Sequence, residues 1–600
     1  MKIKDNLFKL SRRNLIDRKI YNDFRNSLNT QIRNAKSEYY TNKFNENEGN
    51  VKETWITINN TIKTKKKSKE VINLSENDIP IENKDVPNSF NNYFTGIANQ
   101  LSAQLPTSNH RASSYLRDRV NNTFFMNPLE KDEISKAVNK LKYNGKGSKT
   151  ISTLVLKDNS NKLADILMHV LNICIAEGYF PEELKTGCIT PIYKNGPKND
   201  VKNYRPVCSL SPFSKILERI IYNRMIEFID QNKILSLNQF GFRKGFSTES
   251  AIIQFINNIH DGLHHKHNTV AIFMDLSKAF DVLDHNILYT KLEHYGFRGK
   301  ILELLKSFIS NWKYFVSVNG STSETNTVNI GVPQGSTLGP LLFLLYVNDM
   351  SNSSSILNFT QFADDTTITH SGPNLELLTK EIEQELSKVL DWLLANKLII
   401  NLTKTHSMLF TNKRVDRKII IKANNTYLEQ NTECKFLGVI VDDGITWKSH
   451  INHISSKITK TLAILRLLKY TFPKHILKTL YMSLIHPYLN YCNIIWGSAD
   501  KTIIEPLFIL QKKAIRLVNR VHYLEHTKPL FETMKILTVY QLHDLNCLTF
   551  IYKCLNSNQY PDFKNEMNRN SHYHNYNPRN NSDFRLPCRD LKNIRPIILL

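Results

Sequence analysis

The sequence predicts an α+β fold, because helical and strand patterns alternate from about residue 127 onward. The run "TVAIFMD", which ends at Asp275, is continuously apolar up to that residue and is typical of a buried strand. A second strand, "YFVSVNGST", ends at Asn319-Gly320, the dipeptide most typical of a tight hairpin. In "ILELLKSFI", Ile301, Leu304 and Phe308 share one helical face.

Further elements are expected along the chain in the following order. They are an amphipathic helix in residues 90–101, a strand in "GCITPIYKNG", a helix in "SKILERIIYNRMIEFI", and a long helix after Asn374, its predicted N-cap. A strand pair, "KFLGVIV" and "ITW", is predicted with Asp442-Asp443-Gly444 as its turn. Helices then dominate to about Val521, and the last stretch is polar and is expected to be irregular.

Bulk composition restricts the class of partner. The chain has 600 residues, which suggests several domains, and a formal net charge of +24, which favours a polyanion. A basic protein without such a partner is the alternative. The 8 cysteines are scattered without a C-x-x-C pair, which fits a reducing intracellular compartment. No long apolar run or signal peptide is present, so nucleic acid is favoured over a membrane.

Two adjacent aspartates in "QFADDTTI", Asp364 and Asp365, interrupt residues that favour a strand. Like charges there repel each other, and a divalent metal is the best reason to place them at a strand end. Two such ions about 3.5–4 Å apart assist in-line phosphoryl displacement. Asp275, where an apolar strand stops, supplies a second acidic position. The alternative for any Asp-Asp pair is an ordinary turn, which is how Asp442-Asp443 is interpreted.

Seven ordered blocks are similar to one known family. They are "YRPVCSLSPFSKILERI", "NQFGFRKGFST", "AIFMDLSKAFDVLDHNIL", "GVPQGSTLGPLLFLLYVNDM", "QFADDTTI", "NKLIINLTKT" and "KFLGVIVDDGITW". This order resembles the reverse transcriptase of a non-LTR (LINE-type) retrotransposon, most closely of the jockey-like clade. The resemblance runs from "YNDFRNSLNTQIRNAKSEYY" to "LQKKAIRLV".

The resemblance implies a right-hand polymerase with fingers, thumb and an antiparallel palm sheet, plus helical N-terminal and C-terminal regions. The expected boundaries are an N-terminal extension and linker at 1–124, fingers and palm at 125–415, a primer-grip hairpin and helical thumb at 416–530, and a partly irregular C-terminal region at 531–600.

The matched motifs also imply residue roles in metal binding. Asp275 corresponds to the first metal aspartate, with the backbone carbonyl of Leu276 as an additional ligand. Asp364 corresponds to the second metal ligand and Asp365 to the third family carboxylate, which contacts the metals only loosely. The implied cofactor is a pair of Mg²⁺ ions, with Mn²⁺ as an alternative.

Four matched residues concern the nucleotide. Phe280 corresponds to the steric gate that excludes a ribose 2′-hydroxyl, and its alternative is a core aromatic. Gln334 and Gly335 in "GVPQGS" correspond to the loop beneath the incoming sugar. Lys404 in "NLTKT" corresponds to the lysine that stabilises or protonates the departing pyrophosphate, and its alternative is a surface lysine.

Two groups of basic residues are candidates for phosphate contacts. Lys194, Arg205 and Arg243 would contact the triphosphate or template backbone, and structural salt bridges are the alternative. Lys512, Arg516 and Arg520 follow i, i+4, i+8 spacing and would lie on a duplex backbone, and a solvated helix face is the alternative. His260 and His264 have metal spacing but no nearby Glu or Cys to complete a site, so a polar surface is preferred there.

The resemblance therefore implies an RNA-directed DNA polymerase, a nucleotidyltransferase that adds dNTPs to a primer 3′-hydroxyl. The implied partners are an RNA template, a DNA primer or target and dNTPs, in the nucleus and cytoplasm. The chain has no region resembling the endonuclease or zinc knuckle of such elements, so nicking of target DNA is not expected. Lys149 replaces an aspartate that many relatives carry. A catalytically decayed or co-opted RNA-binding remnant and an RNA-dependent RNA polymerase are the alternatives.

Overall fold

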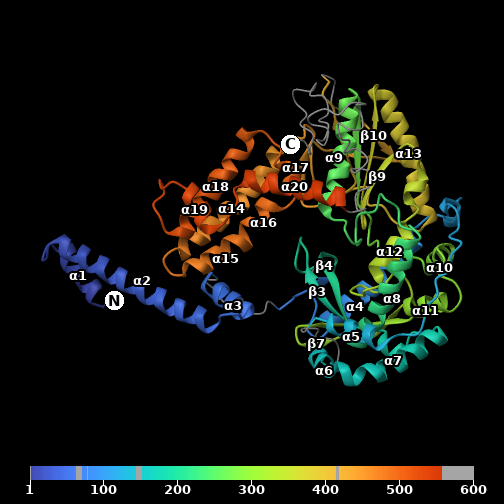
Figure 1. Cartoon of the computed structure of the whole chain (residues 1–600), viewed down its shortest axis with the longest axis horizontal. Helices are drawn as coiled ribbons and strands as arrows, with labels where there is room; N and C mark the ends of the chain where they lie inside the picture. The colour runs from blue at the N-terminus through green and yellow to red at the C-terminus, as the bar shows by residue number, and fades with distance from the viewer. Residues whose placement is uncertain (1, 63–70, 77–78, 143–151, 414–417, 557–600) are drawn as a thin grey trace, which may run out of the picture. The chain divides into compact units, whose positions relative to one another are not determined.

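The computed structural model describes residues 2–62, 71–76, 79–142, 152–413 and 418–556. Lys149, the basic run at residues 63–70 and the C-terminal stretch at 557–600 lie outside these residues. The chain divides into two compact units (Figure 1), one of residues 69–432 and one of residues 1–68 together with 433–600. Helices and strands both contribute, as an α+β class requires.

A five-stranded sheet is the centre of the first unit. Its order is β14 (Glu429–Gln430), β11 (His406–Phe410), β5 (Asn268–Met274), β10 (Asp365–Gly372) and β9 (Asn358–Phe362). All seven residues of β5 are buried, as its apolar sequence predicts, and it pairs antiparallel with both neighbours. Only β14 runs parallel to its partner, so the predicted antiparallel arrangement describes the other four strands.

Two helices cover opposite faces of this sheet, α9 (Thr248–His264) and α13 (Leu375–Ala395), as Figure 1 shows. Phe255 of α9 contacts Phe273 of β5, with ring centroids 5.5 Å apart. Glu381 of α13 binds His370 of β10 at 3.0 Å, and His370 lies on the other face because it pairs with Val270. Each face of the sheet is therefore covered by one helix.

A second sheet in this unit contains β4 (Tyr204–Leu210), β3 (Thr186–Tyr193), β6 (Trp312–Val318), β7 (Ser321–Thr322) and β8 (Asn326–Val328). The hairpin predicted at Asn319-Gly320 is confirmed, since both residues have positive φ and β6 pairs with β7. Helix α4 (Val86–Ala103) packs on this sheet, and its Asn91 amide donates to the carbonyl oxygens of Tyr314 and Glu324.

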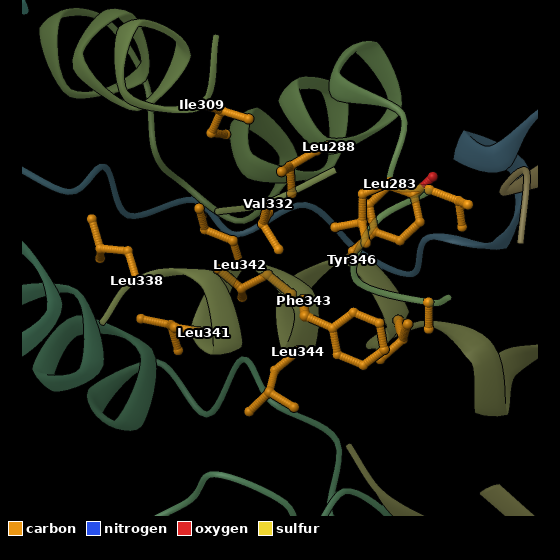
Figure 2. Packing of buried hydrophobic residues seen from close by; sticks show 14 of the residues in the cluster. Leu283, Leu288, Ile309, Val332, Leu338, Leu341, Leu342, Phe343, Leu344 and Tyr346 are labelled. Carbon is orange, nitrogen blue, oxygen red and sulfur yellow. The ribbon is translucent and has the colours of Figure 1, made fainter. Parts of the chain in front are cut away.

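The hydrophobic core cluster of this unit includes helix α12 (Gly339–Val347), of which every residue except Pro340 is buried (Figure 2). Figure 2 shows Leu341, Phe343 and Tyr346 of this helix among side chains from other elements. A helix that is apolar all round can be stable only inside a core. Helix α10 (His285–His294) packs directly on α12. The same cluster includes buried residues of α5 (Lys131–Asn139), α6 (Thr153–Asp158), α7 (Ser160–Glu177), α8 (Pro212–Gln231) and α11 (Lys300–Ile309).

The second unit is mainly helical and combines both ends of the chain. Its aromatic contacts join Tyr40 and Phe44 of α2 to Phe472, with centroids 5.2 and 5.0 Å away. Its helices are α1 (Lys2–Arg12), α2 (Arg18–Glu46), α3 (Val51–Ile62), α14 (Lys448–Leu468), α15 (Lys474–Leu484), α16 (His486–Asn490), α17 (Asn493–Trp496), α18 (Lys501–Asn519), α19 (Lys528–Met534) and α20 (Val539–Asn556).

The predicted pairing of "KFLGVIV" with "ITW" is wrong. Strand β15 (Glu433–Phe436) pairs with β16 (Val439–Asp442), so the hairpin turn is Leu437-Gly438, where both residues have positive φ. The Asp442 carboxylate instead accepts hydrogen bonds from the backbone N–H groups of Thr446 and Trp447, both at 2.9 Å. Local side-chain bonds of this kind favour a turn over a strand, and helix α14 begins directly afterwards.

Across the part of the chain that the structure describes, no helix combines the length and the apolar character needed to span a bilayer.

Candidate active site

The three predicted aspartates lie at one end of the central sheet. Asp275 directly follows β5, and Asp365 begins β10. The register pairs Thr366 with Met274, so one step further Asp365 is adjacent to Asp275. Asp364 lies in the two-residue turn between β9 and β10, after Ala363, which has a φ of 58°. The structure therefore brings together two segments about ninety residues apart in sequence.

The charges of these aspartates affect one another. Burial, followed by the charge of Asp275, raises the pKa of Asp364, and the charges of Arg205 and Lys194 oppose this rise. Burial and the charges of Asp364 and Asp275 raise the pKa of Asp365 to about 6. Asp365 is exposed as a whole residue, which weakens the contribution of burial. Mutual repulsion of this kind favours a bound cation.

The donor chemistry suits Mg²⁺, which prefers carboxylate oxygens and completes its shell with water and substrate phosphates. Among the described residues, however, no three His, Cys, Asp or Glu side chains are arranged as a preformed metal site. Because one or two carboxylates commonly suffice for Mg²⁺, the aspartates fit this ion without such a cage.

Residues 399–405 hold the turn after β5. The backbone N–H of Asn401 donates to the Asp275 carbonyl at 2.8 Å, and that of Ser277 donates to Ile399 at 2.7 Å. Leu276 pairs with Ile400 between these two bonds, so the pairing does not use the carbonyl oxygen of Leu276. The same segment brings the Lys404 ammonium to 3.7 Å from a carboxylate oxygen of Asp275, and both side chains remain substantially exposed.

Three cationic side chains gather near the aspartates. The pKa of Lys194 is lowered by partial desolvation and then by the positive charges of Arg205 and Lys404, while Asp275 opposes this shift. Lys194 follows β3 and Arg205 lies on β4, so both come from the second sheet. Cations that repel one another beside a carboxylate cluster suit a ligand with several negative charges.

Arg243 is placed differently from Lys194 and Arg205. Its guanidinium donates to the carbonyl oxygens of Ser236 at 2.7 Å and Gln239 at 3.0 Å, and it lies 4.4 Å from the ring centroid of Phe246. Burial lowers its pKa, and Asp230 opposes this effect. These contacts favour the structural alternative over a role in binding substrate.

Phe280 lies five residues after Asp275 and is half-buried. Its ring stacks on Phe343 of α12 with centroids 4.3 Å apart and 23° between the planes, and it meets the edge of Phe242 at 6.4 Å. The loop that contains Gly335 passes close to β4, because a Cβ on Gly335 would lie 2.5 Å from the Cys208 carbonyl oxygen. Glycine is therefore required there, because Gly335 has a φ of 85° and this backbone contact leaves no space for a side chain.

Two buried polar residues near the site were missed by sequence reasoning. Gln239 accepts hydrogen bonds from the backbone N–H groups of Gly241 and Ala363, and Glu218 accepts from those of Thr337 and Leu338. Both are at most 1 % exposed. The sequence pattern could have indicated that Glu218 is buried, because it shares a helical face with apolar residues in "SKILERIIYNRM". No comparable pattern surrounds Gln239.

The predicted basic stripe of the second unit binds partners within its own unit. Lys512 pairs with Glu505 at 3.3 Å, and the Arg516 guanidinium donates to the Glu525 carbonyl at 2.7 Å. Arg520 lies beyond the last residue of α18, has a φ of 61°, and donates to the Phe472 carbonyl. Lys512 and Arg520 therefore do not share a helical face as predicted, because α18 ends at Asn519. The contacts of all three residues favour structural roles.

Comparison with known proteins agrees with this geometry. Residues 196–441 match the family model described as reverse transcriptase (RNA-dependent DNA polymerase). The chain is 28% identical over 426 residues to the probable RNA-directed DNA polymerase from transposon BS of Drosophila melanogaster, covering 69% of this chain and 47% of that protein. It is 27% identical over 380 residues to the polymerase from mobile element jockey of the same species, covering 61% of this chain and 41% of that protein.

The chain thus spans less than half the length of these two relatives. A solved structure of telomerase from Candida albicans aligns with 60% of this chain and 68% of the telomerase chain, at 14% sequence identity. The TM-score of 0.33 is too low for this alignment to define the fold. The predicted resemblance of the chain to the polymerases of jockey-like non-LTR retrotransposons is therefore confirmed, and residues 196–441 carry the match to the reverse transcriptase family.

Proposed function

We propose that this chain is an RNA-directed DNA polymerase that adds deoxynucleotides to a DNA primer on an RNA template. The observation that carries the proposal is the register of β5 against β10, which places Asp275, Asp364 and Asp365 at one sheet end. In this proposal the five-stranded sheet is the palm, the β3–β4 sheet belongs to the fingers, and the helices after β16 form the thumb.

Each side chain near the aspartates has a defined task in this reaction. Asp275 and Asp364 would hold two Mg²⁺ ions, which lower the barrier to in-line displacement at a phosphate. Lys194 and Arg205 neutralise the triphosphate of the incoming nucleotide and orient it. Lys404, 3.7 Å from Asp275, stabilises the negative charge that develops on the departing pyrophosphate. The Phe280 ring, supported by Phe343, leaves no space for a 2′-hydroxyl.

The test is primer extension with purified protein, a poly(rA) template, an oligo(dT) primer, dTTP and Mg²⁺. Asp275→Asn and Asp364→Asn should each reduce extension at least about a hundredfold, since metal binding contributes several kcal/mol to such reactions. Asp261→Asn is the control, because Asp261 is an exposed aspartate of the same unit that contacts His265 at the end of α9.

Unchanged extension by Asp364→Asn would refute the metal assignment. Retained, salt-sensitive RNA binding by a wild-type protein that extends no primer would instead identify a decayed or co-opted RNA-binding remnant. A preference for UTP over dTTP in the same assay would identify an RNA polymerase.

A further inference from the structure

Helix α7 carries an apolar stripe on the side that faces away from the core. Its inward face includes the buried residues Ala164 and Leu171, and the helix packs against α5, α6 and α11. On the outward face Ile166 is 61% exposed, Val170 47% and Ile173 50%. Figure 1 shows α7 at the lower margin of the first unit, and the described elements leave the stripe uncovered.

Ile166, Val170 and Ile173 follow the spacing of a single helical face. Positions i, i+4 and i+7 lie within about 60° of one another around a helix with 3.6 residues per turn. A surface helix normally has charged or polar residues on its solvent face, and Ile and Val favour helices less than Lys or Glu. Neither helix propensity nor packing within the described unit therefore explains this row of branched side chains. A contiguous exposed apolar surface is typical of a site that binds another protein.

The stripe ends in charges of opposite sign. Lys162 lies four residues before Ile166 and Glu177 lies four residues after Ile173, so both continue the same helical face. Both side chains are exposed. The outward face of α7 is therefore positive at its start, apolar in its middle and negative at its end.

Neither end charge forms an ion pair in the part of the chain that the structure describes. Lys300 of α11 is near enough to Glu177 for the two charges to attract, but its ammonium binds Glu303 at 3.0 Å instead. Lys162 likewise has no acidic partner among the described residues. Both end charges are therefore available to a second molecule.

These opposite charges decide how a second copy of the helix can lie on the first. Antiparallel packing about a two-fold axis places Lys162 of each copy beside Glu177 of the other, whereas parallel packing places like charges together. In the antiparallel register Ile166 faces Ile173 of the other copy, and the two Val170 side chains meet near the axis. Apolar residues spaced four and three apart are those through which packed helices interlock.

We propose that the outward face of α7 is a dimer interface, in which two copies of this chain pack antiparallel through Ile166, Val170 and Ile173. The contact is isologous, so the same surface serves both copies and the assembly closes at two. One helix from each copy buries less surface than a standard interface, so the dimer should be weak, with a Kd on the order of 10 µM. This inference goes beyond the proposed polymerase reaction and does not depend on it.

The experiment is sedimentation velocity of the full chain, free of nucleic acid, from about 1 to 200 µM, where the wild-type protein should pass from monomer to dimer. Val170→Glu should raise the Kd at least about a hundredfold, because it places two like charges beside each other at the buried axis. Leu377→Glu is the control, because Leu377 is a 59% exposed aliphatic residue in the first turn of another helix, α13. This control should leave the Kd unchanged.

Charge reversal tests the antiparallel register. Lys162→Glu and Glu177→Lys should each raise the Kd about tenfold, because each variant has two like-charged contacts in the dimer. Both changes in one chain should restore the wild-type Kd, since each contact again joins opposite charges. An equimolar mixture of the two single variants should also associate, because one copy then has two negative end charges and the other has two positive ones.

Several results would overturn the inference. They are a wild-type protein that stays monomeric up to about 200 µM, a dimer that survives Val170→Glu, and a double charge reversal that does not restore association. A monomeric protein whose melting temperature falls in Val170→Glu would assign the stripe to a contact within one chain, and would also exclude the dimer. If Val170→Glu fails to fold, the reversals at the exposed positions Lys162 and Glu177 decide the question.

Discussion

The side-chain oxygen of Gln239 lies 2.9 Å from the backbone nitrogen of Ala363, across 124 residues of sequence. The same oxygen accepts from the Gly241 N–H at 2.8 Å, and the side-chain nitrogen lies 3.5 Å from the Ala363 carbonyl. Gly241 packs so closely that a Cβ there would lie 2.3 Å from the Ala363 nitrogen. A segment outside the sheet therefore holds the strained turn that presents Asp364.

Replacing Gln239 by Ala should destabilise the protein and impair primer extension together. The change leaves the buried N–H groups of Gly241 and Ala363 without an acceptor, at a cost of about 1–3 kcal/mol each. The measurement is urea unfolding alongside kcat. Gln254→Ala is the control, because its amide contacts only Asn258 one turn away on α9 among the hydrogen bonds of the described residues. Full activity in a destabilised Gln239→Ala protein would show that the turn does not depend on this contact.

Asp365→Asn should raise the melting temperature of the metal-free protein at pH 7.5, by about 1–2 °C, while reducing primer extension. The reason is that burial and the charges of Asp364 and Asp275 raise the pKa of Asp365 to about 6, so its ionised form is disfavoured in the fold. Mg²⁺ should stabilise the wild-type protein more than the variant. If metal-free Asp365→Asn melts at a lower temperature than the metal-free wild type, repulsion among the aspartates does not destabilise the fold.

Glu218 should make stability decrease as pH rises. Burial raises its pKa from 4.5 to about 7, against hydrogen bonds from the Thr337 N–H, the Ser214 hydroxyl and the Leu338 N–H. The folded state binds this proton more tightly than the unfolded state, so the stabilisation is complete below about pH 4.5 and is lost as pH rises through 7. The loss is on the order of 3 kcal/mol.

Glu218→Gln tests this effect, because it keeps the shape of the side chain and removes the titration. Urea unfolding gives the free energy of unfolding of the variant and of the wild type at pH 5.5 and pH 8.5. The difference, variant minus wild type, should be more positive at pH 8.5 than at pH 5.5. Glu227→Gln, at an exposed position of the same helix, should show no such difference. Parallel pH profiles for wild type and Glu218→Gln would exclude the buried carboxyl as the cause.

Phe280→Val should increase incorporation of UTP relative to dTTP on poly(rA), by roughly tenfold to a hundredfold in the ratio of kcat/KM values. A smaller side chain removes the ring that Phe343 supports at 4.3 Å and leaves space for a 2′-hydroxyl. Phe125→Ala, at a position 78% exposed, is the control. Unchanged sugar selectivity in Phe280→Val would assign the ring to the core instead.

Much of the local structure could be predicted because its causes are local. The apolar run before Asp275 is short and is buried on both faces, as is typical of a central strand, and Asn319-Gly320 forms a hairpin because both residues tolerate positive φ. Asn374 caps its helix with its own carboxamide, which accepts from the N–H groups of Glu376 and Leu377. The site residues that end such elements were therefore visible in the sequence.

The position of the hairpin turn near residue 440 could not be predicted from local sequence patterns. Two turn signals, Leu437-Gly438 and Asp442-Asp443-Gly444, stand five residues apart, and composition favoured the second. In the structure the hairpin turn is Leu437-Gly438. The second signal does not turn a hairpin, because the N–H groups of Thr446 and Trp447 bond to the Asp442 carboxylate there. Likewise, the basic residues Arg243 and Arg520 carry no pattern that separates a backbone-carbonyl contact from a phosphate contact.

The sequence by itself determined that carboxylates follow a buried strand and occupy a tight turn, and that an aromatic residue lies five positions beyond the first of them. Only the tertiary structure decided that Lys404 reaches Asp275, that Gln239 holds the Asp364 turn and that Asp281 faces Gln334. Backbone propensity acts over a few neighbouring residues, whereas these contacts depend on how strands and loops more than fifty residues apart pack against one another.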